Sequence, residues 1–149
     1  MAKIMNRATS IALAVMLGFG VVSSAAGAIL LIAANGGGIP TAYLADTPFD
    51  SYAIPGVILG VIVGGTQMLG AVGILRRWTS GLALAAVAGF GMLIWIFVEL
   101  ALLREYSWLQ TLYFGLGVME LVAVLALSGI VPRIVTPWVP GAVRIAPAS

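Results

Sequence analysis

Four long apolar segments, separated by short polar stretches, dominate the pattern of the chain. They cover about residues 8–34, 55–75, 80–103 and 107–128. Each is close to or longer than the roughly 20 apolar residues that an α-helix needs to cross the hydrocarbon core of a bilayer. The pattern therefore predicts an all-α integral membrane protein, in which residues 1–131 form one domain, a four-helix antiparallel bundle.

The first apolar segment also has features of a secretory signal peptide, because Lys3 and Arg7 precede it and small residues follow. Its apolar run of about 27 residues is longer than the apolar core of such a signal. We therefore expect an uncleaved first helix. Gly20, Ser24 and Gly27 recur at spacings of four and three, so they share one helix face that a second helix can approach closely.

The longest loop follows at residues 35–51, where NGGGIPTAYLADTPFDS cannot continue a membrane span. Tyr43, Phe49 and Tyr52 lie where an aromatic belt at the membrane interface is expected. An alternative is that these three side chains cap the opening of a ligand site. We favour the belt.

The second helix carries a glycine stripe of the form GxxxGxxxG, made by Gly56, Gly60 and Gly64. Such a stripe brings helix backbones together in lipid, where no hydrophobic force drives helices into contact. We expect it to pack within one chain. A homo-oligomeric contact is the alternative.

The basic residues predict the topology. With four spans, six of the seven Lys and Arg residues fall on one side of the membrane, and Arg104 falls on the other side with Asp46, Asp50 and Glu105. The positive-inside rule then places both termini in the cytoplasm of a plasma membrane and the loop at 35–51 outside. The proline-rich residues 132–149 form a cytoplasmic tail.

Composition excludes several kinds of function. The chain is 62% hydrophobic and 8% charged, and its basic residues are scattered beside apolar runs, which argues against nucleic acid as a partner. It contains no Cys and no His. Thiol redox chemistry, thiolate metal sites and histidine-ligated haem therefore have no ligands here. We expect neither an enzyme nor a protein with a cofactor or metal.

Two carboxylic acids interrupt the apolar helices, Glu99 in the third and Glu120 in the fourth. A charged side chain at the centre of the bilayer costs roughly 2.5 to 3.5 kcal/mol on insertion scales, so such groups usually face protein or a cavity and are functional candidates. With a rise of 1.5 Å per residue, Glu99 lies about 6 Å and Glu120 about 20 Å below the outer ends of their helices. The acids therefore predict two separate polar layers.

The deeper candidate site consists of Glu120, Gln67 and Tyr113. Gln67 lies at the same depth as Glu120 and can bond to it if the second and fourth helices touch, and Tyr113 shares a helix face with Glu120. Without a cation partner in apolar surroundings, a carboxyl group favours its neutral form, so we expect Glu120 to be protonated. A structural hydrogen bond and a proton-exchanging group both fit this residue.

The outer candidate layer consists of Glu99, Gln110, Thr111 and Tyr52, which all lie near the outer boundary. For Glu99, one turn from the surface, we favour a structural role.

Several motifs together resemble a group of small four-helix membrane proteins found largely in actinobacteria, whose pattern is close to F-x-x-Y-x-x-P-G, W-I-x-V-Q/E and S-x-L-Q-P-L-Y. The matching pieces here are FDSYAIPG from Phe49, the pair Arg76 and Arg77, LIWIFVE ending at Glu99 and SWLQTLY from Ser107. The chain departs from that pattern at Thr111, where proline is common. The resemblance implies the four-helix fold and topology and no activity. A looser similarity in size and layout to DoxX-like proteins rests on the four-helix plan alone.

Two functions follow as hypotheses. We favour an accessory or scaffold component of a cell-envelope membrane complex, which contacts lipids and either another membrane protein or a second copy of itself. The alternative is a small oligomeric proton-coupled carrier, or a binder of a lipid or small molecule, that uses Glu120.

Overall fold

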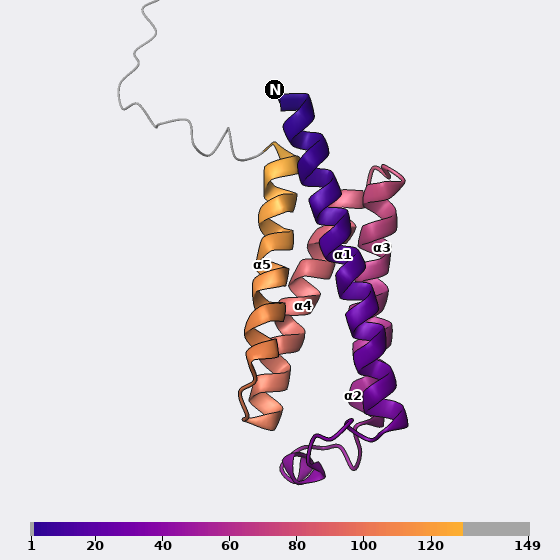
Figure 1. The fold of residues 1–149 in the computed structure, drawn as a ribbon, viewed down its shortest axis with the longest axis vertical. Helices are drawn as coiled ribbons and strands as arrows, with labels where there is room; N and C mark the ends of the chain where they lie inside the picture. Colours follow the sequence, from indigo (N-terminus) through magenta and orange to yellow (C-terminus); the bar gives the residue numbers. More distant parts are fainter. Residues whose placement is uncertain (1, 130–149) are drawn as a thin grey trace, which may run out of the picture.

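The computed structural model describes residues 2–129 and confirms the all-α, four-helix prediction (Figure 1). The helices are α1 (Ala2–Ala33), a second span built from α2 (Ala53–Val57), the π-helical segment η2 (Ile58–Val63) and α3 (Gly64–Leu75), then α4 (Gly81–Leu103) and α5 (Trp108–Ser128). A short 3₁₀ helix, η1 (Thr41–Leu44), lies in the long loop. No strand occurs within residues 2–129. The predicted tail lies outside the described residues.

Each of the four helices is long and apolar enough to cross a membrane: Arg7–Ala33, Ala53–Leu75, Gly81–Leu103 and Trp108–Ser128 have 27, 23, 23 and 21 residues. Many large apolar side chains on their outward faces are exposed, as lipid contact requires. The protein is thus a small, multi-pass integral membrane protein.

Local sequence explains where the helices end. Arg104 caps α4 in a left-handed conformation with φ 53°. Ser107 then starts α5 with a capping box, in which Ser107 and Gln110 each accept a hydrogen bond from a backbone N–H near the start of the helix. Gly129, with φ 68°, ends α5 because glycine adopts this conformation without strain.

Small residues bring the helices close together in the half of the bundle near the N-terminus. The buried cluster there combines Leu13 and Leu17 of α1 with alanines of the other helices, namely Ala71, Ala85, Ala88 and Ala123. Gly73 and Gly81 lie almost in backbone contact, since a Cβ added at Gly81 would lie 2.7 Å from the Gly73 carbonyl oxygen. A buried apolar cluster therefore occupies this end of the bundle.

Toward the other end, α4 and α5 diverge from α1 and α2 (Figure 1). The loop between α1 and α2 lies at this open end. The bundle is thus tightly packed at one end and divided into two helix pairs at the other.

The predicted glycine stripe faces α1 of the same chain. A Cβ at Gly60 would lie 2.9 Å from the Cβ of Ala28, and one at Gly64 would lie 3.3 Å from the Cβ of Ser24. A Cβ at Gly56 would likewise lie within 3 Å of α1 side chains. How strongly stability depends on these glycines stays a prediction.

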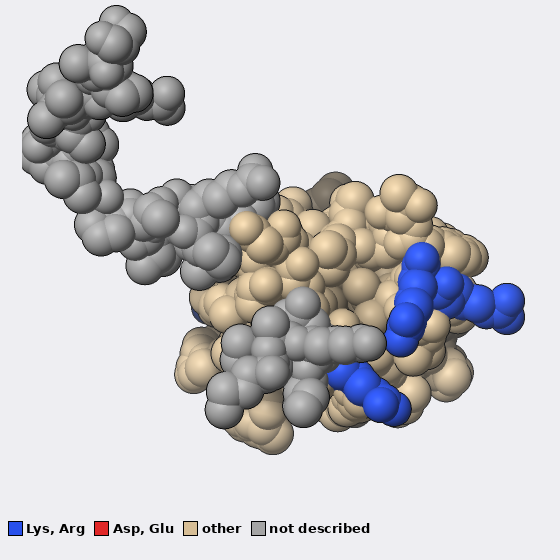
Figure 2. Space-filling model, turned by 90° about the horizontal axis from the view of Figure 1, so that it is seen from above, with Lys and Arg blue, Asp and Glu red and all other residues tan. Residues whose placement is uncertain are grey.

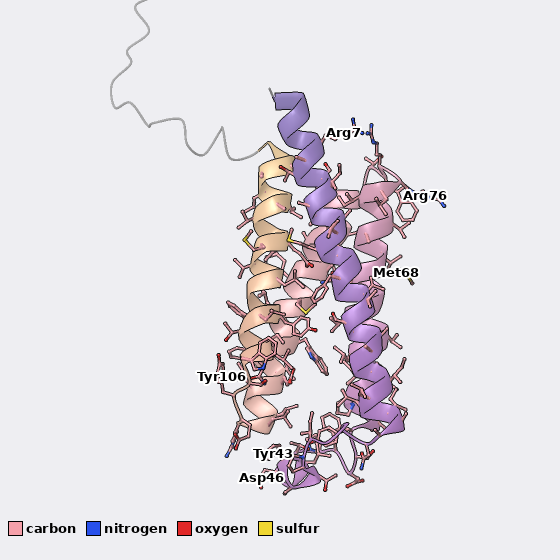
Figure 3. The ribbon with its side chains drawn as sticks, viewed as in Figure 1. Arg7, Tyr43, Asp46, Met68, Arg76 and Tyr106 are labelled. Carbon is pink, nitrogen blue, oxygen red and sulfur yellow. The ribbon has the colours of Figure 1, made fainter. Side chains whose placement is uncertain are left out.

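Charge separates the two ends of the molecule. Arg7 and Arg76 lie at the end with the N-terminus, and Asp46 lies at the opposite end (Figure 3). Viewed from the N-terminal end, the described surface shows basic side chains and no acidic ones (Figure 2). The prediction that both termini are cytoplasmic depends on this unequal distribution of basic residues between the two ends.

Candidate functional site

The inner polar pair joins α3 to α5 at the centre of the bundle. Gln67 and Glu120 are both fully buried, with 0% of each side chain exposed. Gln67 Nε2 donates to Glu120 Oε2 at 3.0 Å and lies 3.5 Å from the carbonyl oxygen of Ala88 on α4. The two residues that share a predicted depth are therefore direct partners.

Gly20 of α1 makes room for this pair. A Cβ at Gly20 would lie only 2.6 Å from Gln67 Oε1 and 2.7 Å from Gln67 Cδ. All four spans consequently meet at the side chain of Gln67.

Each residue of this pair has one side-chain oxygen that accepts no hydrogen bond. Gln67 Oε1 and Glu120 Oε1 are buried and have no hydrogen-bond partner within residues 2–129. Leaving a buried acceptor unpaired is unfavourable, so the geometry is not that of a fully satisfied structural contact. Neither of the two cavities described below is lined by Gln67 or Glu120.

Tyr113, the third member of the predicted inner site, does not join this pair. Its ring stacks on Phe19 of α1, with centroids 6.2 Å apart and planes 22° apart. Tyr113 precedes Glu120 by seven residues, which moves it about 10 Å toward the other end of α5 although it shares the helix face.

In the predicted outer layer, Glu99 and Gln110 are brought together. Gln110 Nε2 approaches Glu99 Oε1 at 3.5 Å, and the Trp95 side chain lies close to the Glu99 carboxyl group. Gln110 Oε1 accepts from the backbone N–H of Ser107 at 2.8 Å. This contact fixes the orientation of the Gln110 amide, so its NH₂ group faces Glu99.

The hydroxyl groups of Thr111 and Tyr52, the other members of the predicted outer layer, form hydrogen bonds to residues other than Glu99. Thr111 is on the exposed side of α5, where its hydroxyl pairs with the Tyr106 hydroxyl at 2.6 Å. The Tyr52 hydroxyl donates instead to the carbonyl oxygen of Pro40 at 2.9 Å. Both hydroxyl groups are therefore already engaged locally.

Tyr52 directly follows the long loop, and loop residues pack around its side chain. Its side chain is 2% exposed, and its backbone N–H donates to Asn35 Oδ1 at 3.0 Å. Gly36, with φ 105°, lies under the ring, where a Cβ would approach Tyr52 Cδ2 to 2.7 Å. Burial raises the pKa of the Tyr52 hydroxyl, and Tyr43 adds to this effect.

Two cavities occupy the open end of the bundle. The smaller, of about 340 Å³, lies between the second span, α4 and the loop, and its lining is almost entirely apolar. The larger, of about 870 Å³, lies between α1, α4, α5 and the loop. Both volumes fall near the roughly 300 to 1,000 Å³ typical of small-molecule sites.

Glu99 and Trp95 line both cavities. Phe49 and Tyr52 border the smaller cavity, and Tyr43 borders the larger one. The loop aromatics thus border the cavities, and whether they form an interfacial belt or cap a ligand opening stays a prediction. Glu99, which is half-buried, is therefore the acid that a bound molecule would meet, and Glu120 is not.

Sequence reasoning did not predict the cavities. Ser23, Ala26 and Gly27 of α1 line the larger one, and such small residues also occur at close helix contacts. The pattern of small residues alone therefore does not distinguish a cavity wall from a close helix contact. Within residues 2–129, no group of three or more acidic, Cys or His residues is arranged to hold a metal ion.

Comparisons with protein-family models, with curated proteins and with solved structures found no match to this chain. The resemblance to the actinobacterial four-helix group therefore stays a prediction. The candidate site rests on the geometry of the chain itself.

Proposed function

We propose that the protein binds a small, largely apolar molecule of the lipid class in the two cavities between its diverging helix pairs. The observation that carries this proposal is the pair of adjacent cavities, of about 340 and 870 Å³, that share Glu99 and Trp95 in their linings. Apolar walls with a few convergent polar groups are the usual composition of a small-molecule site.

The membrane topology gives the direction of access. Arg7, Arg76 and Arg77 lie at the packed end, whereas Asp46 and Glu105 lie at the end with the cavities. We infer that the packed end faces the cytoplasm of the plasma membrane. The ligand would then enter from the outer half of the bilayer or from the external side.

We favour ligand binding over the accessory role because the small residues of the helices already contact other helices of the same chain. Gly20, Gly56, Gly60 and Gly64 all face neighbouring helices of the same chain. These faces are therefore not free to dock a second membrane protein. The proposal contains no catalytic step.

In the proposed binding function, the ligand contacts Glu99 and does not contact Glu120. Glu120 is fully buried against Gln67 and lines neither cavity. A carrier that exchanges protons at Glu120 would need access to that group.

Native mass spectrometry tests the proposal with adjacent alanines of α1. Both side chains are exposed, but Ala26 lines the larger cavity and Ala25 lines neither cavity. We expect the parent protein and Ala25→Trp, purified from membranes, to retain a bound small molecule that Ala26→Trp has lost. Equal retention by both variants, or no bound molecule in the parent, would contradict the proposal.

A further inference from the structure

Glu99 is a carboxyl group in a membrane span without a cationic partner. Its polar neighbours, Gln110 and Trp95, are neutral. Among residues 7–129, no Lys or Arg forms an ion pair with Glu99, including Arg104 five residues later. An acid at this position therefore has donors that suit its ionised form and no group that balances its charge.

The surroundings add further negative charge. Four of the five acidic residues, Asp46, Asp50, Glu99 and Glu105, belong to the loop end of the molecule, and Glu105 lines the larger cavity with Glu99. The basic residue of this end in the sequence is Arg104, which lines neither cavity. The potential at the cavity mouth favours the approach of a cation.

The cavity walls suit a cation that carries hydrocarbon. Trp95 lines both cavities, and the stacked rings of Tyr113 and Phe19 line the larger one. Aromatic faces attract ammonium groups that have lost their water. The smaller cavity continues from Glu99 as a nearly apolar space between the second span and α4.

We propose that the ligand is an amphipathic ammonium compound whose positive charge pairs with Glu99 and whose hydrocarbon part occupies the apolar smaller cavity. This inference rests on the proposed binding function and specifies its ligand class. Glu99 acts as a binding residue, with Gln110 and Trp95 orienting its carboxyl group.

The test compares three probes with the same chain length: octyltrimethylammonium, octanol and octanoate. Each is titrated by calorimetry into the full-length protein in phosphatidylcholine nanodiscs, with empty nanodiscs subtracted. Octanol reports on the apolar cavity alone. We expect the cation to bind at least about tenfold more tightly than octanol, the ratio that corresponds to one favourable charged contact, and octanoate to bind most weakly.

Two matched variants separate a specific contact from a general potential. Glu99→Gln removes the charge of the half-buried acid and keeps an acceptor for Gln110, whereas Asp46→Asn removes a charge of the same sign from an exposed position that lines neither cavity. We expect Glu99→Gln to abolish the preference for the cation while octanol still binds, which also shows that the variant is folded. Asp46→Asn should lower cation affinity by less than about threefold.

The outcomes distinguish the two proposals. If octanol and the cation bind equally to the parent, or if both variants lower cation affinity equally, the ammonium ligand is wrong while apolar binding stands. If none of the probes binds above the empty nanodiscs, the proposed binding function itself fails.

Discussion

Gly20 of α1 lies directly against the side chain of Gln67 of α3, where an added Cβ would come within 2.6 Å of Gln67 Oε1. The glycine face of α1 and the buried amide of α3 are therefore parts of one contact. A methyl group at this position would push Gln67 away from Glu120 or push α1 away from α3.

We predict that Gly20→Ala lowers the thermal stability of the purified protein, since overpacking typically costs about 1 to 3 kcal/mol. Gly18→Ala is the control, because nothing lies within 4 Å of its added Cβ. On helix propensity alone, both changes favour the helix by about 1 kcal/mol. Equal stability of the two variants in detergent melts would argue against the Gly20 contact.

The inner pair predicts different effects for two substitutions of Glu120. Glu120→Gln keeps an acceptor for Gln67 Nε2, so folding should remain near that of the parent. Glu120→Leu leaves this donor with only the Ala88 carbonyl oxygen at 3.5 Å and should cost about 1 to 3 kcal/mol. Denaturation followed by circular dichroism measures both.

A double variant checks the cause of that loss. Gln67→Met with Glu120→Leu replaces both polar partners by apolar groups of similar shape, which restores much of the stability lost in the single Leu variant. If the double variant is less stable than Glu120→Leu alone, the unpaired amide is not the cause. Loss of pH-dependent binding in Glu120→Gln would instead indicate proton exchange at this acid.

The glycine stripe predicts that substitutions at two adjacent residues of the second span affect stability differently. Gly60→Leu would drive a large side chain into Ala28 of α1, whereas Val61→Leu adds to a side chain that is 64% exposed. We expect only the first change to lower the melting temperature or to prevent folding. Two variants with the stability of the parent would remove the argument for close packing at this stripe.

Tyr52 predicts a loss of loop stability at high pH. Its pKa is raised from the ordinary value of 10.0, so the folded loop holds the phenolic proton more tightly than the unfolded loop does. The resulting stabilisation is complete below pH 10 and is lost as the pH rises through the raised pKa. Thermal melts between pH 8 and about pH 11 should show this loss in the parent, and Tyr52→Phe should show less of it.

The sequence was sufficient to predict the four spans because each is a continuous apolar run between charged or glycine-rich breaks. The helix that contains the first span begins before the apolar run, at Ala2, since a basic first turn can continue a helix beyond the hydrocarbon. Equal depth along two helices was enough to suggest the partners Gln67 and Glu120. Helix depth is fixed by the rise per residue and needs no knowledge of packing.

The outer region was less predictable because it depends on tertiary packing. The Tyr52 hydroxyl donates to Pro40 rather than to Glu99, because Asn35 and the positive φ of Gly36 fold the loop around the Tyr52 ring. The cavities arise where the two helix pairs diverge, and this angle is set by side chains of several helices together. The π-helical segment η2 likewise has no simple sequence signal that we can identify.

Trp95 provides the most direct test of ligand binding at this end of the bundle. A protein with Trp95 as its sole tryptophan, in phosphatidylcholine nanodiscs, is titrated with brominated octanol, which quenches indole fluorescence on contact. The matched protein keeps only Trp108, which is 67% exposed and lines neither cavity. We predict saturable quenching of Trp95 that unlabelled octanol reverses, and non-saturable quenching of Trp108; quenching of Trp95 that rises without saturation, as for Trp108, would contradict a binding site between the helix pairs.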